Sequence, residues 1–279
     1  MTDERGTTAP RGVRRWGGYV ALVVVFAVVC GLLSWWQWAR RTEAVTEIHR
    51  VAVNFDARPM PLATALPSLA AWDEDEEWRP VELRGRYLVD EQLLVRNRPY
   101  NGNPGYEQLV PVLLDDGTVF VVDRGWIPSG DNIDKPDSVP SPPSGTVTIV
   151  ARLKPGEPVI PGRGAPHGQI ATINLPTVAH EVDRPSYTGA YGLLDTEDPA
   201  TAAGLPALKP DADEGPHLSY ALQWIAFGIL AFIGLAWAFR RERRIAALPV
   251  AEQAAARNPK RRSIDSDVED DILDRMDQR

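Results

Sequence analysis

Two long apolar segments restrict what this chain can fold into. They cover residues 19–36 (YVALVVVFAVVCGLLSWW) and 218–239 (LSYALQWIAFGILAFIGLAWAF), and neither contains a charged side chain. An α-helix needs about 20 residues to cross about 30 Å of hydrocarbon. The sequence therefore predicts two transmembrane helices that bracket a water-soluble domain.

The charges beside these segments predict their orientation, because Arg and Lys near a membrane segment stay on the cytoplasmic side. The outer flanks carry Arg5, Arg11, Arg14 and Arg15 before the first segment and Arg240, Arg241, Arg243 and Arg244 after the second. The inner flanks are weaker or acidic. We therefore expect an integral protein of the plasma membrane, or of its mitochondrial inner-membrane equivalent, with both termini cytoplasmic and the central domain extracytoplasmic.

A cleaved signal peptide is the alternative for the first segment, since a basic start before an apolar run fits that too. No A-x-A site follows, however, and the chain continues as WWQWARRTEAV, which is compatible with a longer helix. We expect an uncleaved anchor. The predicted parts are a cytoplasmic segment (1–16), a first transmembrane helix (17–38), an extracytoplasmic domain (39–194), an acidic, Pro-rich connector (195–216), a second transmembrane helix (217–239) and a charged cytoplasmic tail (240–279).

Composition excludes several function classes. The net charge of −8 and the lack of a basic patch outside the membrane flanks argue against nucleic-acid binding. The single cysteine, Cys30, excludes an intrachain disulfide and every site that needs paired thiols. No metalloprotease, nucleophile-elbow, phosphate-loop or dinucleotide motif is present. We expect no enzyme, although a membrane-anchored extracytoplasmic enzyme or sensor stays an alternative because catalytic carboxylates leave no sequence motif.

The central domain is predicted to be rich in β-strands. Apolar and polar residues alternate in short runs separated by turn residues such as Asp116-Gly117. The runs are 81–89, 93–97, 106–114, 118–123, 146–153, 169–174 and 188–194. Strands at this spacing predict a small barrel or a sandwich. One short helix is expected over 176–182, and residues 39–53 are expected to extend the first helix into water.

Several motifs carry a resemblance to a known family. The run Leu33 to Arg40 (LSWWQWAR) resembles the L-G-x-W-Q-x-x-R signature that ends the first span in the surfeit locus protein family, the assembly factors of cytochrome c oxidase. Further motifs follow in that family's order: Gly85-x-Tyr87, Arg96-Asn97-Arg98, Gly105-Tyr106, Asp116-Gly117, Arg124-Gly125-Trp126-Ile127-Pro128 and His217-Leu218-Ser219-Tyr220-Ala221-Leu222-Gln223-Trp224. The chain departs from the pattern at Ser34, at Ala151 and in lacking a Lys after Arg40.

The resemblance implies a cofactor at the second span. At 100° per residue, one face of that helix carries His217, Tyr220, Ala221, Trp224 and Phe227. An imidazole beside an aromatic wall suits a planar metal-bearing macrocycle, and the resemblance implies transient binding of heme A with His217 as the iron ligand. The alternative is an interfacial aromatic belt, with His217 capping the helix. Gln37, near the same membrane surface, is expected to bond Gln223 or Tyr220, and Ala27 and Gly31 to allow close helix packing.

Arg124 and Trp126 form a second candidate group. Arg124 could pair with a heme propionate and Trp126 could offer a flat apolar surface. The structural alternative is that Trp126 plugs a barrel and Arg124 pairs with Asp123 or another nearby acid.

The family resemblance thus implies an assembly factor that assists heme A delivery to, or stabilisation in, the catalytic subunit of cytochrome c oxidase. Its partners would be that subunit, the heme A synthesis machinery and membrane lipid. The alternative is a structural scaffold that holds assembly intermediates without binding heme.

Overall fold

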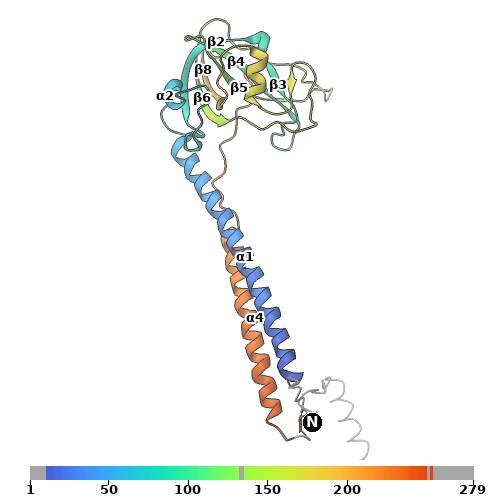
Figure 1. Ribbon diagram of the computed structural model, residues 1–279. Coiled ribbons are helices and arrows are strands. Elements are labelled where there is room, and N and C mark those ends of the chain that lie inside the picture. Colours follow the sequence, from blue (N-terminus) through green and yellow to red (C-terminus); the bar gives the residue numbers. More distant parts are fainter. Residues whose placement is uncertain (1–10, 132–134, 250–251, 254–279) are drawn as a thin grey trace, which may run out of the picture. The chain divides into compact units, whose positions relative to one another are not determined.

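The computed structural model describes residues 11–131, 135–249 and 252–253 and divides into two compact units. One unit comprises Met1–Arg41 and Gly215–Arg279, and the other comprises Thr42–Glu214. Figure 1 shows that the described part of the first unit is a pair of helices and that the second is a β-rich domain. This arrangement confirms the predicted fold class. Most of the predicted cytoplasmic tail lies outside the described residues.

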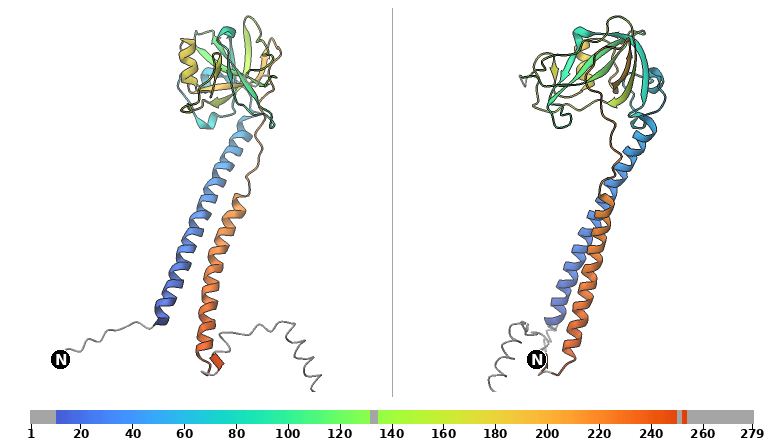
Figure 2. Two further views of the ribbon diagram at one scale, coloured as in Figure 1. Left: turned by 90° about the vertical axis from the view of Figure 1, so that its right-hand side faces the viewer. Right: turned by 180° about the vertical axis from the view of Figure 1, so that it is seen from behind.

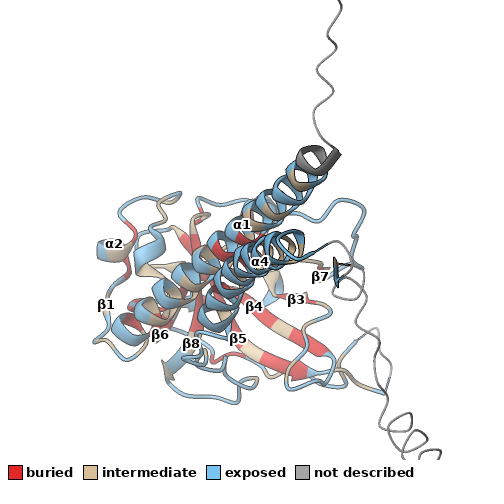
Figure 3. Ribbon diagram, turned by 90° about the horizontal axis from the view of Figure 1, so that it is seen from below, coloured by how far each residue is buried: buried red, intermediate tan, exposed pale blue. Residues whose placement is uncertain are grey.

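The helix pair consists of helix α1 (Arg11–Asn54) and helix α4 (His217–Ala246). Both are long and apolar enough to cross a membrane. Only 11% and 6% of their most apolar windows are buried, whereas a core helix of a soluble protein would be mostly buried. Figure 3 shows the same contrast, with exposed helices and buried central strands. Insertion in a membrane accounts for this exposed apolar surface.

Small side chains form the seam between α1 and α4. Cys30 and Ser34 of α1 and Ala221 and Gly228 of α4 are buried. The Ser34 hydroxyl donates a hydrogen bond of 3.0 Å to the Ala221 carbonyl oxygen. Of the two small residues expected here, Ala27 is half-buried but Gly31 is exposed, so the Gly31 expectation was wrong. The seam passes through Cys30 and Ser34 because helical neighbours lie three or four residues apart.

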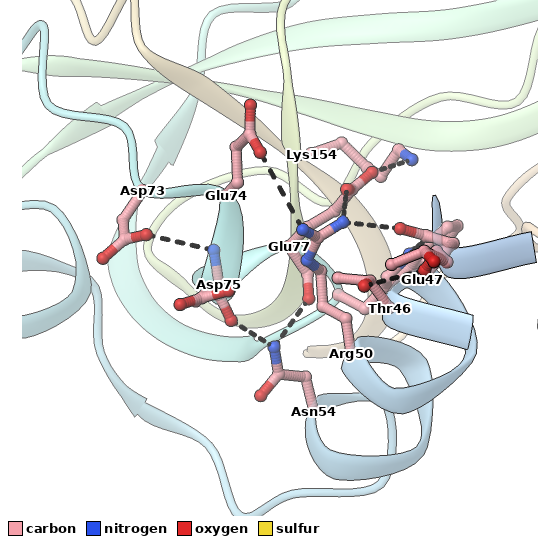
Figure 4. A network of polar contacts seen from close by, with 11 residues as sticks. Thr46, Glu47, Arg50, Asn54, Asp73, Glu74, Asp75, Glu77 and Lys154 are labelled. Carbon is pink, nitrogen blue, oxygen red and sulfur yellow. Dashed lines mark hydrogen bonds and ion pairs between the residues drawn. The ribbon is translucent and has the colours of Figure 1, made fainter. Parts of the chain in front are cut away.

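Helix α1 continues well past the predicted span, as expected for residues 39–53. No Gly or Pro interrupts that stretch. The end of α1 belongs to the second unit, Thr42–Glu214, which is called the barrel unit below. A polar network fixes it there (Figure 4): Arg50 contacts Glu47 at 2.6 Å and Glu77 at 3.3 Å. The Asn54 side chain donates to the backbone carbonyls of Asp75 and Glu77 at 2.6 and 2.8 Å. These contacts, with Val51 in an apolar cluster, stabilise the extension.

The β-rich domain is a closed five-stranded barrel (Figure 2). The strand order is β2–β6–β8–β5–β4, and pairing of β4 with β2 closes it. The barrel strands are β2 (Pro80–Tyr87), β4 (Gly105–Leu114), β5 (Val119–Pro128), β6 (Val147–Pro155) and β8 (Ala190–Asp198). The smaller elements are β1 (Met60–Pro61), β3 (Leu93–Val95), β7 (Gln169–Ile170), α2 (Leu62–Ala65), α3 (Leu175–Val182) and the 3-10 turns Glu74–Glu76 and Val89–Glu91.

Alternating side chains give the barrel an inner and an outer apolar layer. Phe120 and Val122 of β5 join one buried cluster, and Val119 and Val121 join the other. The first cluster includes Leu83, Val112, Ile149 and Ala151 from the neighbouring strands and is the barrel interior. At the closing seam, a Cβ on Gly85 would lie 2.3 Å from the Leu113 carbonyl oxygen. Closure of the barrel therefore requires glycine at position 85.

Several predicted boundaries differ from the structure. Strand β5 extends to Pro128 rather than ending at 123, so Arg124 and Trp126 lie within a strand. Strand β8 extends to Asp198, so the first four residues of the predicted connector belong to β8, and three of them, 196–198, pair with β6. Further along, Leu205 forms two backbone hydrogen bonds with Trp126, of 2.7 and 2.8 Å. Both β5 and β8 are longer than predicted because they pair with neighbouring strands, and local composition does not reveal that pairing.

Candidate functional site

His217 begins helix α4, and its imidazole bonds the other helix of the pair. Its Nδ1 lies 3.0 Å from Oε1 of Gln37 in α1. Helix α4 starts after Pro216 with no side-chain cap, so the capping role considered for His217 was wrong. The expected Gln37 partners, Gln223 and Tyr220, were also wrong, because the Gln37 oxygen contacts the imidazole. This bond joins the family-signature segments of the two helices.

The hydrogen bond fixes which imidazole nitrogen can bind a ligand. An amide oxygen only accepts, so Nδ1 must carry the proton and donate it to Gln37. In the neutral form of the ring the other nitrogen, Nε2, then keeps its lone pair. A neutral imidazole whose second N–H is held by a carbonyl is the usual arrangement of a metal-binding histidine. The residues present therefore fit an iron-ligand role for His217.

Two aromatic side chains of α4 lie in the turns that follow His217. Tyr220 is 47% exposed, and Trp224 is half-buried beside the α1–α4 seam. Trp224 meets Phe227 edge to face, with ring centroids 5.8 Å apart. The structure thus places His217, Tyr220 and Trp224 on neighbouring turns, where exposed ring surface stands next to a half-buried imidazole.

Arg124 lies inside the barrel, where a carboxylate is already bound to it. Its side chain is fully buried, and its Nη2 lies 2.6 Å from Oε1 of Glu197, itself only 4% exposed. Arg124 also donates to the Thr201 hydroxyl at 2.9 Å and to the backbone carbonyl oxygens of Pro140 and Ala202. The Tyr87 hydroxyl donates to Glu197 at 2.8 Å, and the guanidinium lies over the Tyr87 ring. The local acid is Glu197 rather than Asp123, because adjacent residues of a strand face opposite sides.

The ionisation of this pair follows from its contacts. Burial acts to raise the pKa of Glu197, but its hydrogen bonds with Arg124 and Tyr87 hold the pKa below the usual value. Burial and the Glu197 charge raise the pKa of Tyr87 well above its usual value. At neutral pH the barrel therefore contains a charged Arg124–Glu197 pair hydrogen-bonded to a neutral tyrosine.

Trp126 is buried on the outer side of the barrel wall. Its ring stacks on Tyr100 with centroids 5.2 Å apart, and its Nε1 donates to the Arg98 carbonyl oxygen at 2.8 Å. It also covers Gly105, where a Cβ would lie 2.3 Å from the ring. The plug expectation was wrong, because Trp126 pairs in register with Glu107 on the outer face of β4.

A buried acidic group on that outer face was not predicted. Arg98 contacts Glu107 at 2.8 Å and Glu157 at 2.6 Å. Asp123 is 3% exposed, and burial followed by the charge of Glu107 raises its pKa to about 8. No sequence signal marks this group, because its acids come from β4, β5 and the segment after β6.

The five residues predicted for a cofactor site fall into two sets. His217, Tyr220 and Trp224 belong to the helix-pair unit, whereas Arg124 and Trp126 belong to the barrel unit. Within the barrel unit, Arg124 faces the interior and Trp126 the outer layer. Gln37, which the sequence indicated as a partner of Gln223 or Tyr220, joins the His217 set.

Comparison with known proteins identifies the family. The SURF1 family model matches residues 24–229 of the chain. SURF1-like proteins of Mycobacterium bovis and Mycobacterium tuberculosis are each 36% identical over 228 residues, which is 80% of this chain and 82% of theirs. The cytochrome oxidase assembly protein SHY1 of Saccharomyces cerevisiae is 31% identical over 121 residues, which is 42% of this chain and 30% of its own length. The family model covers the signature segments of both helices and the whole barrel, and the chain belongs to the SURF1 family.

Proposed function

We propose that this protein is an assembly factor of cytochrome c oxidase. The proposal is supported by family membership and by the similarity to SHY1, which is named as a cytochrome oxidase assembly protein. The exposed apolar helices support a place in the same membrane as the oxidase. The arginine-rich outer flanks support an orientation with both termini cytoplasmic and the barrel outside.

A more specific part of the proposal is that the helix pair holds heme A for the catalytic subunit. The observation that carries it is the His217–Gln37 bond, which orients a half-buried imidazole so that Nε2, with its lone pair in the neutral ring, is the nitrogen left for iron. Tyr220 and Trp224 would contact the porphyrin face. The iron would gain a nitrogen ligand at that position, and the neighbouring helix would keep the imidazole oriented. Arg124 contributes no propionate contact in this proposal, because Glu197 and Thr201 already occupy its guanidinium.

The assembly role is tested by deleting the gene in a host that has another terminal oxidase. Growth should continue, while cytochrome c oxidase activity and the heme A absorbance of membranes should fall. The expectation follows from family membership. Expression of the wild-type chain in the deletion strain should restore both readouts. Unchanged oxidase spectra in the deletion strain would contradict the assembly role.

The heme role is tested by His217→Ala in protein purified from heme A-producing cells. The Soret absorbance per protein should be lost while membrane abundance is nearly unchanged, because a half-buried residue at a helix end contributes little to folding. Gln37→Leu should weaken heme retention without abolishing it, since the ligand remains but its orienting acceptor is gone. Loss of the hydrogen-bond partner of a metal-binding histidine typically costs about 10–100-fold in affinity.

The matched control is His49→Ala, which removes an exposed histidine of α1 in the barrel unit. Its heme content should equal that of the wild type. Equal heme in the wild type and in His217→Ala, at equal protein levels, would favour the scaffold function without heme. An oxidase defect that persists with no heme bound to any variant would support that same scaffold function.

A further inference from the structure

The two helices enclose a groove at the ends that carry arginine. It lies between α1 near Arg15 and α4 near Arg241, and its volume is about 650 Å³. Gly234 forms part of the groove lining, and a Cβ added there would meet no atom within 4 Å. This space therefore exists because a small residue stands where a larger side chain would fit. It is separate from the His217 end of the same helices.

The groove changes from polar to apolar along the helix axis. Arg15, Arg241 and Glu242 line one end, and Leu22, Val23 and Leu235 line the other. Arg15 and Leu22 are seven residues apart, which is about 10 Å along a helix. Trp16 and Trp237 also line the groove. Tryptophan is typical of the headgroup level of a bilayer. A ligand in this groove needs a polar head and an apolar tail in the same order as a membrane lipid.

The charge at the polar end favours an anionic head. Among the described residues that line the groove, Glu242 is the only acid, and it pairs with Arg15. Arg241 stacks against Trp237 at 5.7 Å. The last turns of α4 add Arg240, Arg243 and Arg244. Arginine near a membrane surface attracts anionic lipid by about 1 kcal/mol per charge.

We propose that this groove binds one anionic phospholipid. The phosphate would lie against Arg241 and Arg15, and one acyl chain would lie over Gly234 along Leu22 and Leu235. A lipid in this position fills the space between α1 and α4 and contacts both helices at the ends that carry the arginines. The proposal is independent of heme binding and of the orientation of the chain.

Native mass spectrometry of the detergent-purified full-length protein tests the proposal, with phosphatidylglycerol and phosphatidylcholine of identical acyl chains as probes. The wild type should retain one phosphatidylglycerol and should bind it more tightly than phosphatidylcholine. Gly234→Leu should abolish this binding, because its side chain occupies the acyl position. Gly18→Leu is the matched control: Gly18 is also exposed with open space at its Cβ, but it does not line the groove.

The charge is tested with a second matched pair. Arg241→Gln should weaken phosphatidylglycerol binding about fivefold, the equivalent of about 1 kcal/mol per arginine. Arg244→Gln, which removes an arginine that does not line the groove, should leave the binding nearly unchanged. Equal retention of the two lipids by the wild type, or unchanged retention by Gly234→Leu, would overturn the proposal. A lipid-free dimer that Gly234→Leu dissociates would also overturn it, in favour of a second copy as the occupant.

Discussion

Replacing Arg124 by Met is expected to lower the free energy of unfolding by about 3–5 kcal/mol. The side chains of Arg124 and Glu197 are 0% and 4% exposed, so removing the cation leaves an uncompensated carboxylate inside the barrel. The hydrogen bond to Thr201 would be lost as well. For a domain of this size the loss corresponds to a fall of roughly 6–20 °C in the unfolding midpoint. Thermal unfolding of the full-length protein in detergent measures it.

Arg84→Met is the matched control, because it removes an arginine from β2 whose ion pair is exposed. Arg84 and Asp115 are 3.8 Å apart, with side chains 68% and 73% exposed. Exposed pairs contribute about 0–1 kcal/mol, so the midpoint should barely change. Adding Glu197→Gln to Arg124→Met should recover part of the loss, since the buried charge is then removed. Equal midpoints for Arg124→Met and Arg84→Met would show that the buried network does not stabilise the barrel.

Stability is expected to fall as the pH rises from 6 to 8, and Asp123→Asn should reduce this fall. Burial, followed by the charge of Glu107, raises the pKa of Asp123 from 3.8 to about 8 in the folded protein. Between these values the unfolded chain has released the Asp123 proton while the folded chain keeps it. Each pH unit therefore removes up to about 1.4 kcal/mol of stability, or about 2–3 kcal/mol from pH 6 to 8.

Unfolding midpoints at pH 6, 7 and 8 measure the effect. The Asn side chain can still accept the 2.9 Å hydrogen bond that the Gly125 amide donates to Asp123, so Asp123→Asn preserves that contact. Asp116→Asn is the control, because Asp116 is exposed and its hydrogen bonds with Thr118 lower its pKa. Its stability contribution is lost only at acidic pH, so its slope from pH 6 to 8 should equal that of the wild type. Parallel curves for Asp123→Asn and the wild type would contradict the raised pKa.

Local sequence patterns were sufficient for most of the longer elements and for the family. Alternating residues in β2 and β6 predicted strands close to those observed, and the Pro176 region predicted α3 to within one residue. The choice between barrel and sandwich was left open. It depends on the pairing of β4 with β2 at Gly85, which is a contact between distant segments.

The candidate site was likewise predicted only where local sequence was enough, and not where it depends on contacts between distant segments. The order of signature motifs located His217, Tyr220 and Trp224, but the Gln37–His217 bond spans 180 residues and needs the two helices to pack. The same holds for Arg124, whose partner Glu197 is 73 residues away and was placed in a connector. A side chain's partner is set by strand register and helix packing, which a local window does not contain.

The sequence by itself determined the two spans, the β-rich domain between them and the family, because hydrophobic length, residue alternation and ordered motifs are local properties. Only the tertiary structure decided that Arg124 faces inward to Glu197, that Trp126 lies outside the barrel under Tyr100, and that Gly234 opens a groove. Each of these depends on which side of a strand or helix meets another segment. That is a matter of long-range packing, and one residue of register reverses it.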